Sequence, residues 1–112
     1  MDISQEIKDH LNKLNHTLLT EQDKASNLKA VIQLNLLGEY GSDYYLRLQD
    51  GQINTGSGYA KTPDLTITMT AEDFLLVTKG EVNPMELVIS GRVQVEGDKM
   101  LAMRVTNIMQ RK

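Results

Sequence analysis

The spacing of apolar residues changes along this chain, and that change constrains its fold more than any other feature. Over roughly the first 18 residues the apolar positions recur at steps of three and four, which is typical of one face of a helix. These positions are Ile3, Ile7, Leu11, Leu14 and Leu18. Further along the chain the period falls to two, which is typical of half-buried strands. Both periods in one chain predict helices packed against a sheet.

Five segments carry the period of two and are predicted to be strands: residues 32–36, 44–49, 52–57, 65–70 and 93–95. Asp50-Gly51, between the second and third of them, is a strong hairpin signal. We therefore expect the first three strands to pair as a meander. The threonines of the fourth strand are expected to lie on the more solvent-exposed side of the sheet.

Helix signals fill the other segments. They predict a short helix over residues 20–30, helices over 71–80 and 84–91, and a last helix that follows Gly97-Asp98. The last helix carries an apolar stripe made of Leu101, Ala102, Val105, Ile108 and Met109. Residues 1–112 are therefore predicted to form a single α+β domain of two layers, a five-stranded mixed sheet with helices covering one face.

Two of these helices have well-defined predicted ends. Thr70 is placed to cap the first of them, with Asp73 three residues later completing the cap, and Gly80 is a typical C-terminal glycine. Asn83-Pro84 combines an N-cap residue with a proline at the first helical position.

Composition excludes several classes of function. The chain has no cysteine, so it has no disulfides, thiolate nucleophile or zinc ribbon. Its net charge of −3 argues against a nucleic-acid partner. Residues 92–112 nevertheless hold five basic and two acidic residues, a local balance of +3. Residues 1–4 lack the basic start and apolar run of a secretory signal, and we expect a soluble, cytoplasmic protein.

The candidate reactive residues do not form a site. His10 and His16 are six residues apart on the first predicted helix, so they do not share a face and no metal site is expected. Gly56-Ser57-Gly58 does not match a nucleophile elbow or a dinucleotide-binding loop. We therefore expect no catalytic residue and no cofactor, and predict that the protein is not an enzyme.

An ordered set of short motifs over residues 64–109 resembles the sterol carrier protein 2 family of lipid-binding and lipid-transfer domains. The set consists of Asp64-Leu65-Thr66-Ile67-Thr68-Met69, Asp73-Phe74, Gly80 with Asn83-Pro84, Ser90-Gly91-Arg92-Val93, Val95 with Gly97, Leu101-Ala102-Met103-Arg104-Val105 and Asn107. The resemblance implies a five-stranded sheet with one face covered by helices, and an apolar tunnel between the two layers. It also implies binding of a fatty acid, acyl-CoA, phospholipid or sterol without modification.

The residues expected to line that tunnel come from both layers. Strand alternation and the helical stripes suggest Leu34, Leu36, Leu46, Leu48, Ile67, Met69, Phe74, Leu75, Met85, Leu87, Val88, Leu101, Val105 and Ile108. We expect a cavity of roughly 300–1,000 Å³, lined mainly by the helical members of this set.

Two functions stay open at this point. The first is binding or transfer of a hydrophobic ligand by a monomer or weak dimer, with transient contact between the basic C-terminal end and anionic membranes. The alternative is a dimerisation module, or an accessory domain that presents a substrate to a partner enzyme. Family domains do occur fused to enzymes, which keeps this alternative open.

Overall fold

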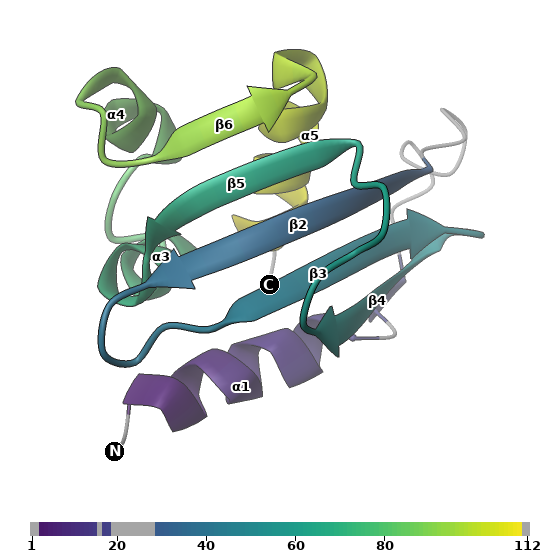
Figure 1. Ribbon diagram of the computed structural model, residues 1–112, viewed down its shortest axis with the longest axis horizontal. Coiled ribbons are helices and arrows are strands. Elements are labelled where there is room, and N and C mark those ends of the chain that lie inside the picture. Colours follow the sequence, from purple (N-terminus) through teal and green to yellow (C-terminus); the bar gives the residue numbers. More distant parts are fainter. Residues whose placement is uncertain (1–2, 16, 19–28, 111–112) are drawn as a thin grey trace.

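The computed structural model describes residues 3–15, 17–18 and 29–110, and for residues 14, 17, 18 and 105–110 the backbone alone. A mixed sheet forms one layer and helices form the other (Figure 1). The strands lie in the order β1 (Thr17–Leu18), β4 (Gln52–Ser57), β3 (Asp43–Gln49), β2 (Ala30–Leu37), β5 (Leu65–Thr70) and β6 (Gln94–Gly97). Strands β2 and β5 are parallel, and all other neighbours are antiparallel.

The five predicted strands are confirmed, and the first three form the predicted meander. Register places the alternating apolar residues on one face. Leu34 lies opposite both Tyr44 and Ile67, and Ile67 lies opposite Val95. All except the half-buried Val95 are buried. The alternation of apolar and polar residues therefore gives the sheet one apolar face, which is typical of half-buried strands.

The helices cover this face: α1 (Ile3–Leu14), α3 (Ala71–Thr78), α4 (Pro84–Ile89) and α5 (Lys99–Gln110). Helix α1 contacts β4 and α3, and α3 contacts β2 and β5. Helix α5 contacts α3 and β6. None of the helices in the described part of the chain is both long enough and apolar enough to cross a membrane.

The opposite face of the sheet is crossed by the connection from β4 to β5, which passes in front of β3 and β2 in Figure 1. This crossing explains a buried polar side chain, because Gln33 is only 3% exposed. Its Oε1 accepts the backbone N–H of Ala60 at 2.7 Å, and its Nε2 donates to the carbonyl oxygen of Gly58 at 3.1 Å. The amide is therefore satisfied where it is buried.

The first helix is shorter than predicted. It ends at Leu14, whereas Thr17 and Leu18 pair with Ile53 and Gln52 at the edge of the sheet. Asn15 contributes to this change, because its Oδ1 accepts the backbone N–H of Thr55 at 3.0 Å. A tertiary contact therefore overrides the apolar step from Leu14 to Leu18.

The predicted helix over 20–30 lies almost wholly outside the described residues. Its last residue, Ala30, begins strand β2. The prediction is therefore wrong at Lys29, which is not helical, and at Ala30, and it stays a prediction for residues 20–28.

The predicted caps are confirmed. Thr70 Oγ1 accepts the backbone N–H of Asp73 at 3.1 Å, and Asn83 Oδ1 accepts that of Met85 at 2.9 Å. Gly80 and Gly91 follow α3 and α4 with φ of +73° and +82°, a conformation that glycine adopts without strain.

Candidate functional site

A cavity of about 490 Å³ lies between the sheet and helices α3, α4 and α5. Its floor comes from β2, β5 and β6, and its walls come from the three helices and the segment that enters α4. The lining residues are Leu34, Ile67, Met69, Val77, Asn83, Pro84, Met85, Val88, Val93, Val95, Lys99, Ala102 and Met103. Their apolar character makes this a site for a hydrophobic group.

The cavity opens between α4 and α5. The floor residues Leu34, Ile67 and Met69 are buried, and so are Val77, Val93 and Ala102. The exposed lining residues all belong to residues 83–88 or to α5: Asn83, Met85, Val88, Lys99 and Met103. Both polar lining residues, Asn83 and Lys99, are therefore at the rim, and the interior is apolar.

Helix α4 forms one wall, and its sequence explains why it leaves space beneath it. It is six residues long, with Asn83 as N-cap and Pro84 at its start. Leu87 is its one buried residue, at 2% exposed. Met85 and Val88 border the cavity instead. A helix anchored by a single buried side chain fills little of the volume below it.

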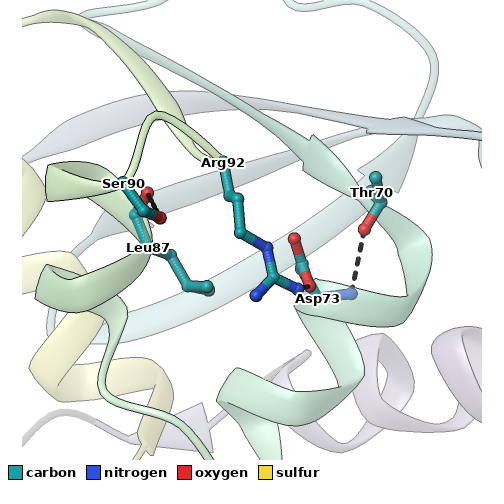
Figure 2. A network of polar contacts seen from close by, with 5 residues as sticks. All are labelled: Thr70, Asp73, Leu87, Ser90 and Arg92. Atoms are coloured by element: carbon teal, nitrogen blue, oxygen red, sulfur yellow. Dashed lines mark hydrogen bonds and ion pairs between the residues drawn. The ribbon is translucent and has the colours of Figure 1, made fainter.

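An ion pair ties the end of this wall to α3. Figure 2 shows the Arg92 guanidinium beside the Asp73 carboxylate, next to the N-terminus of α3. Asp73 is 3% exposed, whereas the Arg92 side chain is 55% exposed. Arg92 therefore satisfies a buried carboxylate and holds the turn after α4 against α3.

The same pair corrects one detail of the sequence prediction. The backbone of Asp73 takes part in the Thr70 cap, as predicted, but its carboxylate pairs with a residue 19 positions away. Ser90, in the turn before Arg92, donates its hydroxyl to the carbonyl oxygen of Leu87 at 3.1 Å (Figure 2). The end of α4 thus has two polar restraints.

The residues predicted to line the tunnel fall into three groups. Five border the cavity: Leu34, Ile67, Met69, Met85 and Val88. Seven others pack into the core instead, with Leu101 half-buried and the rest buried: Leu36, Leu46, Leu48, Phe74, Leu75, Leu87 and Leu101. The side chains of Val105 and Ile108 lie outside the described residues.

Eight lining residues are not in the predicted set: Val77, Asn83, Pro84, Val93, Val95, Lys99, Ala102 and Met103. Val93 and Val95 had a usable signal, since the fifth predicted strand points them both to one face. Ala102 belonged to the predicted stripe of the last helix. Lys99 and Met103 had no such signal, because charge and exposure are usual on a helix surface.

Candidate metal ligands do not cluster in the described part of the chain. No group of three or more histidine, aspartate or glutamate side chains there could hold a metal ion. His16, one of the two histidines weighed as ligands, lies outside the described residues. Each buried polar side-chain atom of the described residues has a hydrogen-bond partner.

Comparison with known proteins assigns the family. The SCP-2 sterol transfer family matches residues 11–110 of this chain. The chain belongs to this family. The resemblance over residues 64–109 is thus confirmed, and it extends across the meander and into the first helix.

Solved structures of this family share the fold. The solution structure of palmitated SCP2L2 from Aedes aegypti superposes with a TM-score of 0.66 at 20% identity, over 97% of this chain and 92% of that one. A ubiquinone synthesis protein, UbiJ-SCP2, superposes with a TM-score of 0.69 at 16% identity, over 96% and 92%.

Among curated proteins, this SCP-2 domain is similar to part of hydroxysteroid dehydrogenase-like protein 2 from Xenopus tropicalis. The two are 27% identical over 92 residues, which is 81% of this chain and 22% of that protein. The chain therefore spans about a fifth of the length of the curated relatives it matches.

Proposed function

We propose that this SCP-2 domain binds a hydrophobic ligand in the cavity between α4, α5 and the sheet, and transfers it without modifying it. The observation that carries the proposal is the apolar interior of a 490 Å³ cavity with its polar residues confined to the rim. Lipid binding is the general role that the family suggests.

Burial energies support reversible binding. Each methylene transferred from water contributes about 0.8 kcal/mol, so about ten methylenes contribute on the order of 8 kcal/mol. Loss of translational and rotational freedom offsets several kcal/mol of this sum. A dissociation constant in the micromolar range or weaker follows, which suits a carrier that must also release its ligand.

In this proposal the ligand contacts Leu34, Ile67 and Met69 on the floor and Met85 and Val88 on the wall. Contacts from Val105 and Ile108 on α5 stay predictions. The seven core residues act indirectly, by holding the two layers apart at the distance that the cavity needs.

A pair of alanine-to-leucine variants tests the site. Ala102 lines the cavity, whereas Ala30 is buried at the start of β2, away from it. We expect Ala102→Leu to fill part of the void and to weaken uptake of a fluorescent fatty acid at least fivefold, with the fold retained. Ala30→Leu is the matched control and should lower stability while leaving uptake by the folded fraction unchanged.

The carrier proposal makes a second prediction about the protein purified from its own cells. Native mass spectrometry should show a co-purifying lipid. An empty protein that also takes up no fluorescent fatty acid would overturn the proposal.

The alternative is an accessory module for an enzyme. It is supported by the relatives named hydroxysteroid dehydrogenase-like, of which this domain matches about a fifth. In this version the domain presents its bound ligand to a catalytic partner, or dimerises. An empty dimer in native mass spectrometry would favour it over the carrier.

Contact with anionic membranes and a cytoplasmic location stay predictions. Of the basic residues that motivate the first, Lys99 lies at the cavity rim, while Arg111 and Lys112 lie outside the described residues. The absence of cysteine suits a reducing compartment, which is consistent with the second.

A further inference from the structure

We propose that Lys99 makes this cavity selective for single-chain amphiphiles that carry an anionic group, either a carboxylate or a phosphate. The inference rests on the proposed function and deepens it by naming the ligand class. It follows from three features of the site: its volume, the distribution of polarity along it and the one cationic group among its lining residues.

The volume sets the number of chains. A water molecule occupies about 30 Å³ of liquid and a methylene group is of similar size, so 490 Å³ holds about sixteen methylenes. That is one acyl chain of ordinary length. A lipid with two such chains needs about twice this volume, and it would have to leave one chain in water at a cost of about 0.8 kcal/mol for each exposed methylene.

The polarity sets the orientation. The floor and the inner walls are built from aliphatic and thioether side chains, which offer no partner to a polar head group. A carboxylate or phosphate buried there would lose its hydration without gaining a hydrogen bond or an ion pair. The free-energy cost of that loss is far larger than any free energy gained by burying the head group. The chain must therefore enter first, and the polar head group must stay at the rim between α4 and α5.

Lys99 is the charged residue that meets the head group at this rim. It is the first residue of α5, it is exposed, and it lines the cavity. A lysine in this position can lay its apolar stem along the cavity wall and keep its ammonium in water. Among the described residues, no acidic side chain belongs to the lining, so the ammonium supplies the electrostatic preference of the site.

The two acidic residues that lie closest to Lys99 in the sequence, Glu96 and Asp98, do not cancel this preference. Asp98 directs Oδ1 to the N-terminus of α5, where it accepts the backbone N–H of Met100 at 2.9 Å. Glu96 lies on β6, opposite Thr66, whereas its neighbour Val95 lines the cavity. Successive residues of a strand point to opposite faces, so Glu96 lies on the face away from the cavity.

Three probes with the same chain test the inference: dodecanoate, dodecyl phosphate and dodecanol. Dissociation constants are measured by displacement of a fluorescent fatty acid from the full chain. We expect the unmodified protein to bind both anions about fivefold tighter than the alcohol, as one partly exposed ion pair allows. Lys99→Gln should remove this difference by weakening the anions alone, and Lys99→Arg should retain it.

A control and a salt series complete the test. Lys61 is also exposed but does not line the cavity, so Lys61→Gln should keep the anion preference. Added salt should weaken the anions and leave dodecanol unchanged, because exposed charges are screened. If only dodecanoate binds more tightly than dodecanol, the site prefers a carboxylate. If only dodecyl phosphate does so, the site prefers a phosphate.

The outcomes distinguish the two levels of the proposal. Equal binding of all three probes, or a loss in Lys99→Gln that is the same for dodecanol, would overturn the selectivity and leave the binding function standing. A diacyl phospholipid that binds as tightly as its single-chain counterpart would overturn the single-chain assignment. Uptake of none of the probes would overturn the proposed function itself.

Discussion

The two halves of the sheet carry the same alternation of apolar residues but are covered differently. Under α1, Ile7 and Leu11 join Leu46, Leu48 and Ile53 in the core, and all five are at most 4% exposed. Under α4 and α5, the equivalent face of β2, β5 and β6 borders a cavity. We call these regions the filled half and the hollow half.

The difference arises from the helices and not from the strands. Helix α1 has 12 residues and presents Ile7 and Leu11, one turn apart, to the sheet. Helix α4 has six residues and buries only Leu87. A short helix between an Asn-Pro start and a glycine end cannot cover the strands below it, and the space that remains is available to a ligand.

The largest expected effect comes from truncating a leucine in each half. Truncating a buried leucine to alanine lowers the free energy of unfolding by about 2–5 kcal/mol. We expect Leu46→Ala to lie near the upper end of this range, because neighbours surround the side chain. Leu34→Ala should cost toward the lower part, since one side of Leu34 already faces the void and loses few contacts there. Urea denaturation measures both. Equal costs would mean that the hollow half is packed as tightly as the filled half.

The next prediction concerns the ion pair that holds the hollow half together. Arg92→Leu leaves the Asp73 carboxylate buried without its partner, and should lower the free energy of unfolding by about 1–3 kcal/mol. Because Arg92 follows α4, the fluorescent fatty acid should also dissociate faster.

The double variant Asp73→Asn with Arg92→Leu sharpens this result. Replacing the carboxylate removes the buried charge, so the double variant should regain part of the lost stability. The test compares losses in the free energy of unfolding. If the loss in the double variant equals the sum of the losses in the Asp73→Asn and Arg92→Leu single variants, the two side chains are not coupled.

Some features of both halves could be predicted from the sequence, and others could not. Local signals predicted the strands and the caps at Thr70 and Asn83, because each depends on residues within a few positions. The end of the first helix and the partner of Asp73 depend on contacts 40 and 19 residues away, which periodicity cannot reveal. Alternation identified the apolar face, but it could not separate Leu46, which is covered, from Leu34, which borders the cavity.

A smaller effect is expected at the start of α4. Asn83→Ala removes the side chain that accepts the Met85 N–H and should cost about 1 kcal/mol of stability. If Asn83 acts only as a cap, ligand affinity should change no more than this loss explains. Asn83→Ser keeps a capping oxygen and is the control. A drop in affinity at an unchanged melting temperature would instead assign Asn83 a direct role at the cavity rim.

The smallest expected effect is a pH dependence in the filled half. Partial burial lowers the pKa of His10 on α1 below its ordinary value of 6.5, and the positive charges of Lys13 and Lys79 lower it further. Glu6 and Asp9 act in the opposite direction and offset part of this shift. The folded protein therefore favours the neutral imidazole. Its contribution to stability is complete above pH 6.5 and is lost as the pH falls through the lowered pKa of the folded state.

His10→Gln isolates this contribution. The variant keeps His16 and all carboxylates, so the difference between its stability curve and that of the unmodified protein reports His10 alone. We expect the unmodified protein to lose stability relative to the variant as the pH falls below about 6.5, and the two curves to run parallel above that value. His10 lies in the filled half, away from the cavity. The affinity for dodecanoate, corrected for the folded fraction, should therefore not show the same pH dependence as the stability. A relative gain in stability at low pH would show that Glu6 and Asp9 outweigh burial, and would place His10 in an environment that favours its charge.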